Sequence, residues 1–391
     1  MKNERISDFL QSRIEARDFP SAVYLVAEKG EIIFQDALGL AVVEPEKIEA
    51  RIDTVYDLAS LTKVLVTGLL CAKLIEKGEM NLSDKISGYF NEFDTSEKRE
   101  ITIENLLTHT SGFTGWQPFY LLMNERKNEP LKGLESVSVT DFFDSPAGER
   151  IRGLIAARTL ENPVDSKVVY SDLNFILLGF LLEKLYRKPL DEIAEREIFE
   201  PLNLRDTFFN PPQELKRRTA ASEKGNEHEK RTCIEQGYEI QNPQSQFRNR
   251  IVWGEVHDGN CYFMNGVSGH AGLFSTAEET FKIARQFLAE ETVLLKPETC
   301  KLFRTNYTRG LNEARSVAFQ LAETPDSTAS KALASDSFGH LGFTGTSLWI
   351  EPETERIFIL LTNRTHAREL PFVNINSVRR RFHELAVEKL K

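Results

Sequence analysis

The sequence of 391 residues predicts an α/β fold in which both ends of the chain build one sheet layer around a helical middle. Two β-prone runs flank a glycine within residues 22–38. Two more, at 346–350 and 356–362, flank a polar Glu-Pro-Glu-Thr-Glu turn near the end. Apolar residues at helical spacing dominate the region between them. We therefore expect two hairpins, one from each end, and an inserted α-rich part.

The first eighty residues alternate between helix and hairpin. Residues 3–19 place apolar side chains at three- and four-residue steps, which predicts an opening amphipathic helix. Residues 22–38 are typical of two strands joined at Gly30. A wide apolar face returns at 57–78, where Gly78 provides a stop, so we expect a buried helix there.

The remaining elements favour an insertion between the two hairpins. Helical patterns recur at 102–108 and 175–185, separated by loops rich in Pro and Gly. Residues 210–250 are strongly polar, which predicts long surface loops. Residues 376–390 predict a closing helix. The expected domains are an α/β domain of residues 1–95 and 206–391 and an inserted α-rich domain of residues 96–205.

Composition and charge exclude several classes of protein. The formal net charge is −10 and no long basic stripe interrupts it, which argues against a nucleic-acid partner. The longest apolar runs, 64–72 and 175–182, are far shorter than the roughly 20 residues that span a bilayer, so no membrane segment is expected. Charged residues occupy the N-terminus where an export signal would be apolar, and we expect a cytoplasmic protein.

Motifs for metals and cofactors are missing from the sequence. The four cysteines show no Cys-x-x-Cys spacing, the seven histidines show no His-Glu-x-x-His pattern, and no Gly-rich phosphate loop precedes a helix. We therefore expect reduced structural thiols and neither a metal nor an organic cofactor. A small molecule is the expected partner, and composition predicts no particular oligomeric state.

A candidate nucleophile lies at the start of the predicted buried helix. Ser60 and Lys63 form Ser-Leu-Thr-Lys, and a spacing of three puts both side chains on one face of a helical turn. A serine hydroxyl needs a nearby group to take its proton, and burial by the following Val64 can lower the pKa of a lysine enough to do so. The alternative is a capping serine beside a surface lysine.

Two later segments carry side chains that suit the same chemistry. Tyr170 lies in a loop directly before a long apolar run, where a phenol can take and return a proton, although it can equally be a packed ring. His340 opens the C-terminal hairpin and Gly342 follows, so backbone N–H groups there can approach a ligand. Similar local patterns occur at 89–91 (Tyr-Phe-Asn) and 270–272 (His-Ala-Gly). We favour His340 over the second because a strand follows it.

Taken in order, these motifs resemble those of a known superfamily. Ser-x-x-Lys at 60–63, Tyr-Ser-Asp at 170–172 and His-x-Gly at 340–342 resemble the serine β-lactamase and penicillin-binding-protein superfamily. The segments 106–112 and 269–276 are similar to landmarks of its class C β-lactamase-related branch, of esterase, D-peptidase or muramyl-amidase type. The resemblance implies a β-lactamase/transpeptidase-like fold, with an antiparallel sheet flanked by helices plus an inserted mostly α-helical region.

The resemblance also implies roles for individual residues. Ser60 would be the acylated nucleophile, and Lys63 and Tyr170 would handle its proton. The N–H groups of Ser60 and Phe343 would bind the oxyanion. Asp172 stands where many members carry Asn, and its charge would keep Lys63 protonated, which moves the role of base toward Tyr170.

The third motif departs from the pattern of the penicillin-interacting members. They use Lys-Thr-Gly to hold a substrate carboxylate, whereas this chain has His340, Leu341 and Gly342. A neutral imidazole and an isobutyl group cannot replace both a charge and a hydroxyl. We therefore expect poor hydrolysis of β-lactams and of D-Ala-D-Ala, and a substrate that lacks this carboxylate.

A more specific similarity comes from residues 253–260, which resemble amidases that cut the muramyl–L-alanine bond. The stretch contains His257 and Asp258, and His270 follows, so these are further candidate site residues, with hydrogen-bonded loop residues as the equal alternative. The expected function is a serine hydrolase that forms an acyl-enzyme on an ester or amide, with peptidoglycan-derived fragments as one candidate substrate class. The rival is a catalytically silent member that binds a muropeptide or a partner in the same cleft.

Overall fold

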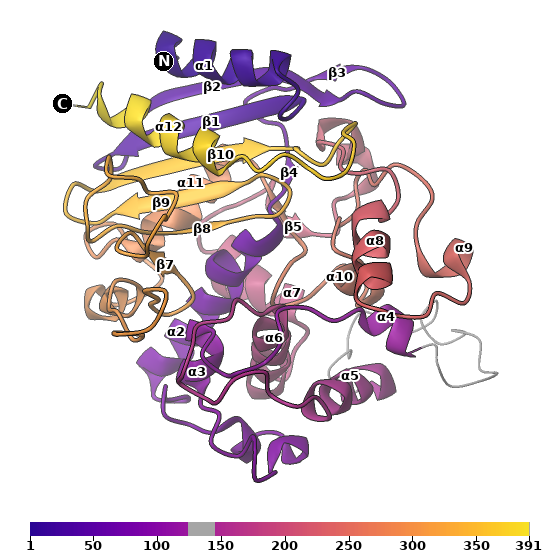
Figure 1. Ribbon diagram of the computed structural model, residues 1–391. Helices are drawn as coiled ribbons and strands as arrows, with labels where there is room; N and C mark the ends of the chain where they lie inside the picture. Colours follow the sequence, from indigo (N-terminus) through magenta and orange to yellow (C-terminus); the bar gives the residue numbers. More distant parts are fainter. Residues whose placement is uncertain (124–144, 391) are drawn as a thin grey trace.

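The computed structural model describes residues 1–123 and 145–390, so part of the predicted insertion, residues 124–144, lies outside the described residues. A large antiparallel sheet has the strand order β3-β2-β1-β10-β9-β8-β7, and a smaller one has the order β4-β6-β5 (Figure 1). The strands are β1 (Ser21–Glu28), β2 (Glu31–Val42), β3 (Ile48–Glu49), β4 (Tyr56–Asp57), β5 (Phe208–Phe209), β6 (Leu273–Ser275), β7 (Gln320–Leu321), β8 (Phe338–Leu341), β9 (Ser347–Glu351) and β10 (Arg356–Thr362).

Helices cover both faces of the large sheet and fill the region below it in Figure 1. The α-helices are α1 (Glu4–Glu15), α2 (Leu69–Lys77), α3 (Ile103–Thr108), α4 (Phe119–Leu122), α5 (Pro146–Ala156), α6 (Asp172–Tyr186), α7 (Leu190–Ala194), α8 (Glu227–Glu235), α9 (Pro243–Gln246), α10 (Gly259–Phe263), α11 (Ala277–Ala284) and α12 (Asn376–Val387). The 3₁₀- and π-helices are η1 (Ala59–Leu61), η2 (Lys63–Gly68), η3 (Ile86–Gly88), η4 (Asn91–Phe93), η7 (Glu195–Phe199), η8 (Gln213–Arg218), η9 (Arg285–Phe287) and η10 (Pro297–Phe303).

The two ends of the chain meet in the centre of the large sheet. Strand β1 pairs with β10 in antiparallel register, with Ala22 opposite Thr362 and Glu28 opposite Arg356. The first hairpin turns at Lys29 and Gly30, both with positive φ, where glycine is the residue that adopts this conformation without strain. The predicted fold class and both predicted hairpins are therefore confirmed.

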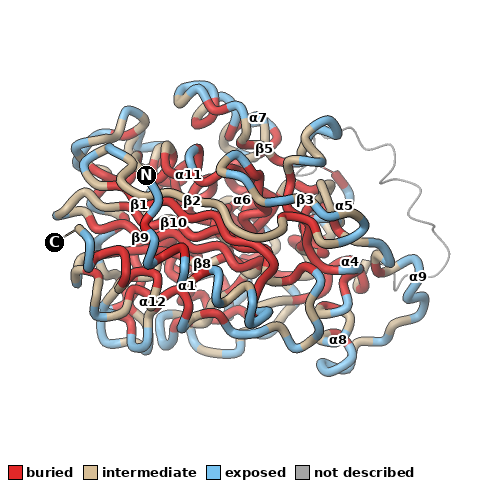
Figure 2. Tube along the Cα trace, turned by 90° about the horizontal axis from the view of Figure 1, so that it is seen from above, coloured by how far each residue is buried: buried red, intermediate tan, exposed pale blue. Residues whose placement is uncertain are grey.

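Both faces of the central strands are buried, and the alternation of side chains divides the core in two. Tyr24 and Val26 of β1 pack with α1 and α12 on one face. Val23 and Leu25 point to the other face, toward the helical region that contains α2 and α6. Figure 2 shows the resulting buried centre around β1, β10 and β9. Burial on both faces explains why these strands read as continuous apolar runs.

The predicted helix 57–78 is composite. Its first residues belong to strand β4 and to η1, a π-helical stretch η2 follows, and the α-helix α2 ends at Gly78 with φ of 71°. Helix α6 begins at Asp172, earlier than the apolar run indicated, which places this carboxylate in the first helical turn. A π-helical turn is often found at functional sites.

The prediction of long surface loops over residues 210–250 is right about the surface position of η8 and α9, which have no buried residues, but wrong around α8, which belongs to the buried part of the molecule. The segment contains η8, α8 and α9, and it buries Glu223, Glu229 and Cys233. The misleading feature is its polarity: these side chains face one another and the rest of the chain instead of water. Buried polar groups that satisfy one another look, in sequence, like a solvated segment.

The division into two domains stays a prediction. Among the described helices, none is long and apolar enough to cross a membrane. Cys71, Cys233, Cys261 and Cys300 are all free and buried.

Candidate active site

A strained turn places Ser60 at the end of strand β4. The residue before it, Ala59, has φ of 48°, a left-handed conformation that costs free energy for a residue other than glycine. The Ala59 N–H donates to Asp57 Oδ1 at 2.8 Å, and the His257 N–H donates to Asp57 Oδ2 at 2.7 Å. The buried Asp57 carboxylate thus holds the turn that presents the Ser60 hydroxyl.

Lys63 contacts Ser60 directly and is fully buried. Its Nζ lies 2.9 Å from Ser60 Oγ, 2.9 Å from the carbonyl oxygen of His270 and 2.7 Å from Asp172 Oδ1. Burial lowers the pKa of Lys63, but the negative charge of Asp172 and the nearby Tyr170 outweigh it, so the net pKa is raised. Lys63 is therefore an ammonium at neutral pH.

Tyr170 joins this pair from the loop before α6. Lys63 Nζ lies 5.1 Å from the centroid of the Tyr170 ring. The phenol oxygen is buried, and Lys63 and Ser60 are the polar groups beside it. Burial raises the pKa of Tyr170, Lys63 and Ser60 lower it, and the net shift is upward. The hydroxyl, amine and phenol that the sequence singled out therefore meet at one point.

Two neutral histidines lie on either side of the Tyr170 ring. The ring centroids of His109 and Tyr170 are 4.6 Å apart, and those of Tyr170 and His340 are 5.7 Å apart. Burial lowers the pKa of both imidazoles well below the usual range. His109 Nδ1 accepts from the Ser171 N–H at 3.1 Å, and His340 Nδ1 contacts the Leu341 carbonyl at 2.9 Å. His109 thus positions the loop that carries Tyr170; the sequence points only to the segment 106–112 that contains it and assigns His109 no role.

The third motif is tied to the backbone just before Ser60. Thr344 Oγ1 donates to the Asp57 carbonyl at 2.8 Å, and Thr346 Oγ1 donates to the Leu58 carbonyl at 3.0 Å. At Gly342, a Cβ atom would lie 2.6 Å from the Leu58 carbonyl oxygen, so only glycine permits this approach. The Phe343 N–H, beside this contact, has no acceptor within the described part of the chain.

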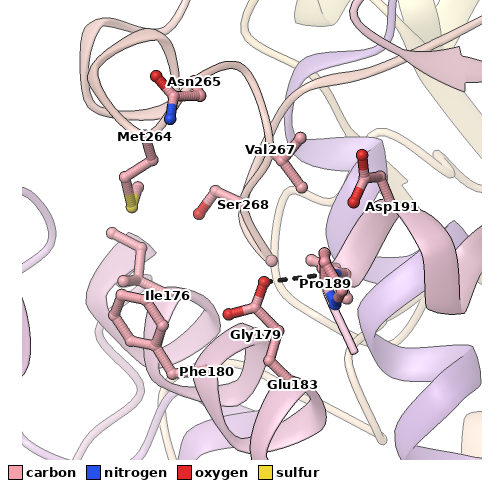
Figure 3. A pocket seen from close by; sticks show the side chains of 12 residues that line it. Ile176, Gly179, Phe180, Glu183, Pro189, Asp191, Met264, Asn265, Val267 and Ser268 are labelled. Atoms are coloured by element: carbon pink, nitrogen blue, oxygen red, sulfur yellow. Dashed lines mark hydrogen bonds between the residues drawn. The ribbon is translucent and has the colours of Figure 1, made fainter. Parts of the chain in front are cut away.

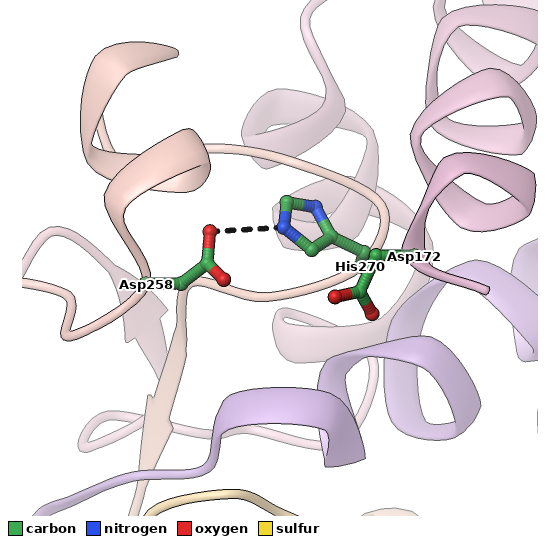
Figure 4. A group of neighbouring side chains, drawn as sticks. All are labelled: Asp172, Asp258 and His270. Atoms are coloured by element: carbon green, nitrogen blue, oxygen red, sulfur yellow. Dashed lines mark hydrogen bonds and ion pairs between the residues drawn. The ribbon is translucent and has the colours of Figure 1, made fainter. Parts of the chain in front are cut away.

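His257, Asp258 and His270 all lie at the site, on the loops before and after α10. Asp258 caps α10 through the Cys261 N–H and contacts His270 Nε2 at 3.0 Å (Figure 4). His270 lowers the pKa of Asp258 despite burial. His257 Nε2 contacts Glu223 Oε2 at 2.8 Å, and this carboxylate raises the pKa of His257 although burial opposes it.

The ligand atoms of Asp172, Asp258 and His270 lie within 4.8 Å of one another, which is close enough to suggest a metal site. However, Asp172 pairs with the Lys63 ammonium, and Asp258 shares a hydrogen bond with His270. A cation here would lie beside the Lys63 charge. We therefore interpret the cluster as balancing Lys63 and not as a metal site.

Helix α8 supplies site residues that sequence reasoning missed. His228 and Glu229 line the same cavity as Ser60. Glu229 accepts from the Tyr120 hydroxyl at 2.8 Å and from the Gly259 N–H at 2.8 Å. Burial, reinforced by the charge of Asp258, raises the pKa of Glu229 to about 7. No sequence motif indicates that this helix contributes to the site, because its polar residues are typical of a solvent-exposed helix.

Two cavities open on either side of Ser60, and they share Ser60, Tyr170 and Phe343. One, of about 280 Å³, we call the acidic pocket; its charged and titratable lining is Asp172, Glu229, Asp258, His228, His257 and His270. The other, of about 290 Å³, we call the arginine pocket; its polar lining includes Arg315, Gln320, His340, Arg364 and Arg379.

A third hollow lies between α6 and the loop after α10, away from Ser60 (Figure 3). Glu183 and Ser268 are among its lining residues, and its volume of about 20 Å³ is enough for little more than a water molecule. It is not a substrate site.

The geometry can support acyl transfer. A serine hydroxyl contacts a buried amine, a phenol lies beside both, and a backbone N–H without an acceptor lies on the facing hairpin. These are the parts that covalent catalysis at a carbonyl requires.

Comparison with known proteins agrees with this arrangement. The family model described as Beta-lactamase matches residues 6–377. A putative D-alanyl-D-alanine carboxypeptidase of Escherichia coli (strain K12) is 30% identical over 89% of this chain and 79% of its own length. An N-acetylmuramyl-L-alanine amidase of Bacillus subtilis (strain 168) is 30% identical over 93% of this chain and 83% of its own length.

A solved structure shows the same fold. The penicillin-binding protein homolog from Caulobacter crescentus superimposes with a TM-score of 0.68 at 18% identity, over 100% of this chain and 98% of that one. With a family model that covers nearly the whole sequence, the chain belongs to the β-lactamase family and is a serine hydrolase.

Proposed function

We propose that the protein hydrolyses an amide or ester through an acyl-enzyme on Ser60, and that its substrates are peptidoglycan-derived fragments. The observation that carries the first part is the 2.9 Å contact between Lys63 Nζ and Ser60 Oγ beside Tyr170. The Ser60 oxygen bonds to the substrate carbonyl carbon while its proton passes to the Tyr170 phenolate. The N–H groups of Ser60 and Phe343 bind the oxyanion.

The second half of the cycle regenerates the enzyme. The bond to the leaving amine or alcohol breaks, and the leaving group departs with the proton held by Tyr170. Water then adds its oxygen to the acyl carbon and gives its proton to Tyr170. The bond between the acyl carbon and Ser60 Oγ breaks, Tyr170 passes the proton to Ser60, and the carboxylic acid product leaves. Because the pKa of Tyr170 is raised, its phenolate is the minor form at neutral pH, and Lys63 stabilises that form by charge.

The choice of substrate class is supported by the relatives. One is named for the muramyl–L-alanine bond and another for the D-alanyl-D-alanine bond, and both cover most of this chain. Two cavities of nearly equal volume flank Ser60, so groups on both sides of a scissile bond have room to bind. A panel of muramyl peptides and D-alanyl peptides, with products identified by mass spectrometry, tests this part.

The experiment for the acyl-enzyme is a burst assay. Wild-type protein mixed with p-nitrophenyl acetate should release one equivalent of p-nitrophenol per active site before steady turnover, and a fluorophosphonate should add to Ser60 in the intact mass. Ser60→Ala should lose both signals while its circular dichroism stays unchanged. Turnover retained by Ser60→Ala would overturn the proposal.

One observation favours the silent binder as a second candidate. Asp172 pairs with Lys63 at 2.7 Å and keeps the amine protonated, which removes it as a free base. Absence of both burst and turnover, with muropeptide binding retained by calorimetry, would decide for that function.

A further inference from the structure

The arginine pocket contains two guanidinium groups without a counter-ion. Arg364 and Arg379 both line the cavity that contains Ser60. No carboxylate of the described residues forms an ion pair with either of them, and none contributes to their electrostatic surroundings. Arg379 is 5% exposed. Buried charges in proteins are normally paired, because an unpaired charge away from water is unfavourable.

Each of the two guanidinium groups has one nitrogen that donates no hydrogen bond to the described residues. Arg364 donates through Nε to the Phe343 carbonyl and through Nη1 to the Val373 carbonyl, and its Nη2 has no acceptor among the described residues. Arg379 donates to Asn376 and to the carbonyls of Gly342 and Thr346, and its buried Nε has no partner.

The electrostatic cost is visible in both pKa values. Burial lowers the pKa of Arg364 to about 10. Burial, followed by the charge of Arg364, lowers the pKa of Arg379 to about 9. An anion bound in this cavity would remove the cost. By contrast, Arg315 in the same pocket already pairs with Glu313 at 2.7 Å and does not need one.

From these contacts we propose that Arg364 binds a carboxylate of the substrate, with the unpaired charge of the buried Arg379 behind it, so that the protein selects amides or esters bearing a negative charge on the side of the arginine pocket. The proposal rests on the proposed function, because it names the substrate of the same site. It also reverses the expectation from the third motif: the positive charge missing at His340 is supplied by two arginines that follow it, one after β10 and one on α12.

The opposite pocket strengthens the assignment. Asp172, Asp258 and Glu229 line it, and the first two keep side-chain exposures of 18% and 21%. These carboxylates already have partners in Lys63, His270 and Tyr120, so the acidic pocket offers a substrate carboxylate no unpaired cation, whereas the arginine side does. The charge difference across Ser60 thus fixes the direction in which an anionic substrate binds.

The test compares matched thioesters. One series places the charge on the leaving thiol, as an acylglycyl ester of thioglycolic acid or of its neutral thioglycolamide. A second series places it on the acyl group, as a succinyl or a succinamyl thioester. Released thiol gives kcat/KM for each. In the wild-type protein, we expect kcat/KM for the anionic member of one series to be roughly 10- to 100-fold higher than kcat/KM for its neutral partner.

Variants connect that preference to the arginines. Arg364→Met should reduce the anionic-to-neutral ratio to about one, and Arg364→Lys should retain part of it. Arg381→Met, on the exposed side of α12, is the matched control and should keep the wild-type ratio. Arg379 also holds the backbone of the third motif, so Arg379→Gln is informative only if its thermal unfolding resembles wild type.

The outcomes separate the two proposals. Equal rates for both members of both series in the wild-type protein, or a preference that survives Arg364→Met, would overturn the arginine assignment while Ser60 acylation stands. Failure of every thioester, with no fluorophosphonate adduct, would instead remove the proposed function.

Discussion

The two pockets beside Ser60 are nearly equal in volume, about 280 and 290 Å³, yet their charged linings differ. The acidic pocket is lined by three carboxylates, whereas the arginine pocket has three arginines and no carboxylate in its lining. They share Ser60, Tyr170 and Phe343. Since the volumes are nearly equal, the proposed preference of a substrate for one side depends on charge and not on space.

The largest expected effect comes from changing Lys63, which contacts Ser60 where the two pockets meet. Lys63→Met removes the positive charge that stabilises the Tyr170 phenolate, so the acylation rate should fall roughly 10²–10⁴-fold, measured from the p-nitrophenol burst. Lys77→Met, on the exposed end of α2, is the control for loss of a lysine. Acylation at the wild-type rate in Lys63→Met would show that the amine plays no part.

A smaller and more informative effect is expected from the acidic side. Asp172 raises the pKa of Lys63 and, less strongly, that of Tyr170. Since the reactive phenolate forms as pH rises and the pKa of Tyr170 is raised, the wild-type rate should still increase in the alkaline range. Asp172→Asn removes the negative charge, so the rising limb of the pH–rate profile should move down by about one unit.

The control for that profile is Asp8→Asn, an exposed carboxylate on α1. A profile of Asp172→Asn that coincides with the wild type would contradict the electrostatic coupling. A shift to higher pH would contradict it as well, because losing the negative charge of Asp172 lowers the pKa of Lys63 and of Tyr170 alike.

The smallest expected effect concerns stability. The pKa of Glu229 is raised from 4.5 to about 7, so its protonated form favours folding, and this contribution is lost as pH rises through about 7. Glu229→Gln mimics the protonated form. The difference in unfolding free energy between Glu229→Gln and wild type should therefore shift in favour of the variant by about 3 kcal/mol from pH 4 to pH 8. Urea unfolding at both pH values measures it. Parallel pH dependences would show that Glu229 stays ionised.

Local patterns sufficed for the parts of the site that depend on short spacing. Ser60 and Lys63 are one helical turn apart, and the order of the three motifs led to the family. The two hairpins followed from glycine and polar turns between β-prone runs. The nature of Asp172 also indicated a protonated Lys63, in agreement with the direction of its pKa. The catalytic roles themselves stay predictions.

The rest depends on contacts between distant segments. Arg379 reaches the carbonyl of Gly342 across 37 residues, and no local pattern distinguishes it from the neighbouring Arg380 and Arg381. In the same way, Glu229 is buried because Tyr120 and Gly259 satisfy it. Which of many charged side chains is buried follows from the assembled fold, and a polar stretch alone does not reveal it.

The pairing of β1 with β10 has a consequence for biosynthesis. Ser60 leaves the ribosome early, but the hairpin that faces it is fixed only when residues up to Thr362 have emerged and Thr344 and Thr346 can reach the backbone before Ser60. A nascent chain cannot complete the site around Ser60 before the C-terminal hairpin has folded against it. Hydrolytic competence should therefore arise late in synthesis and all at once.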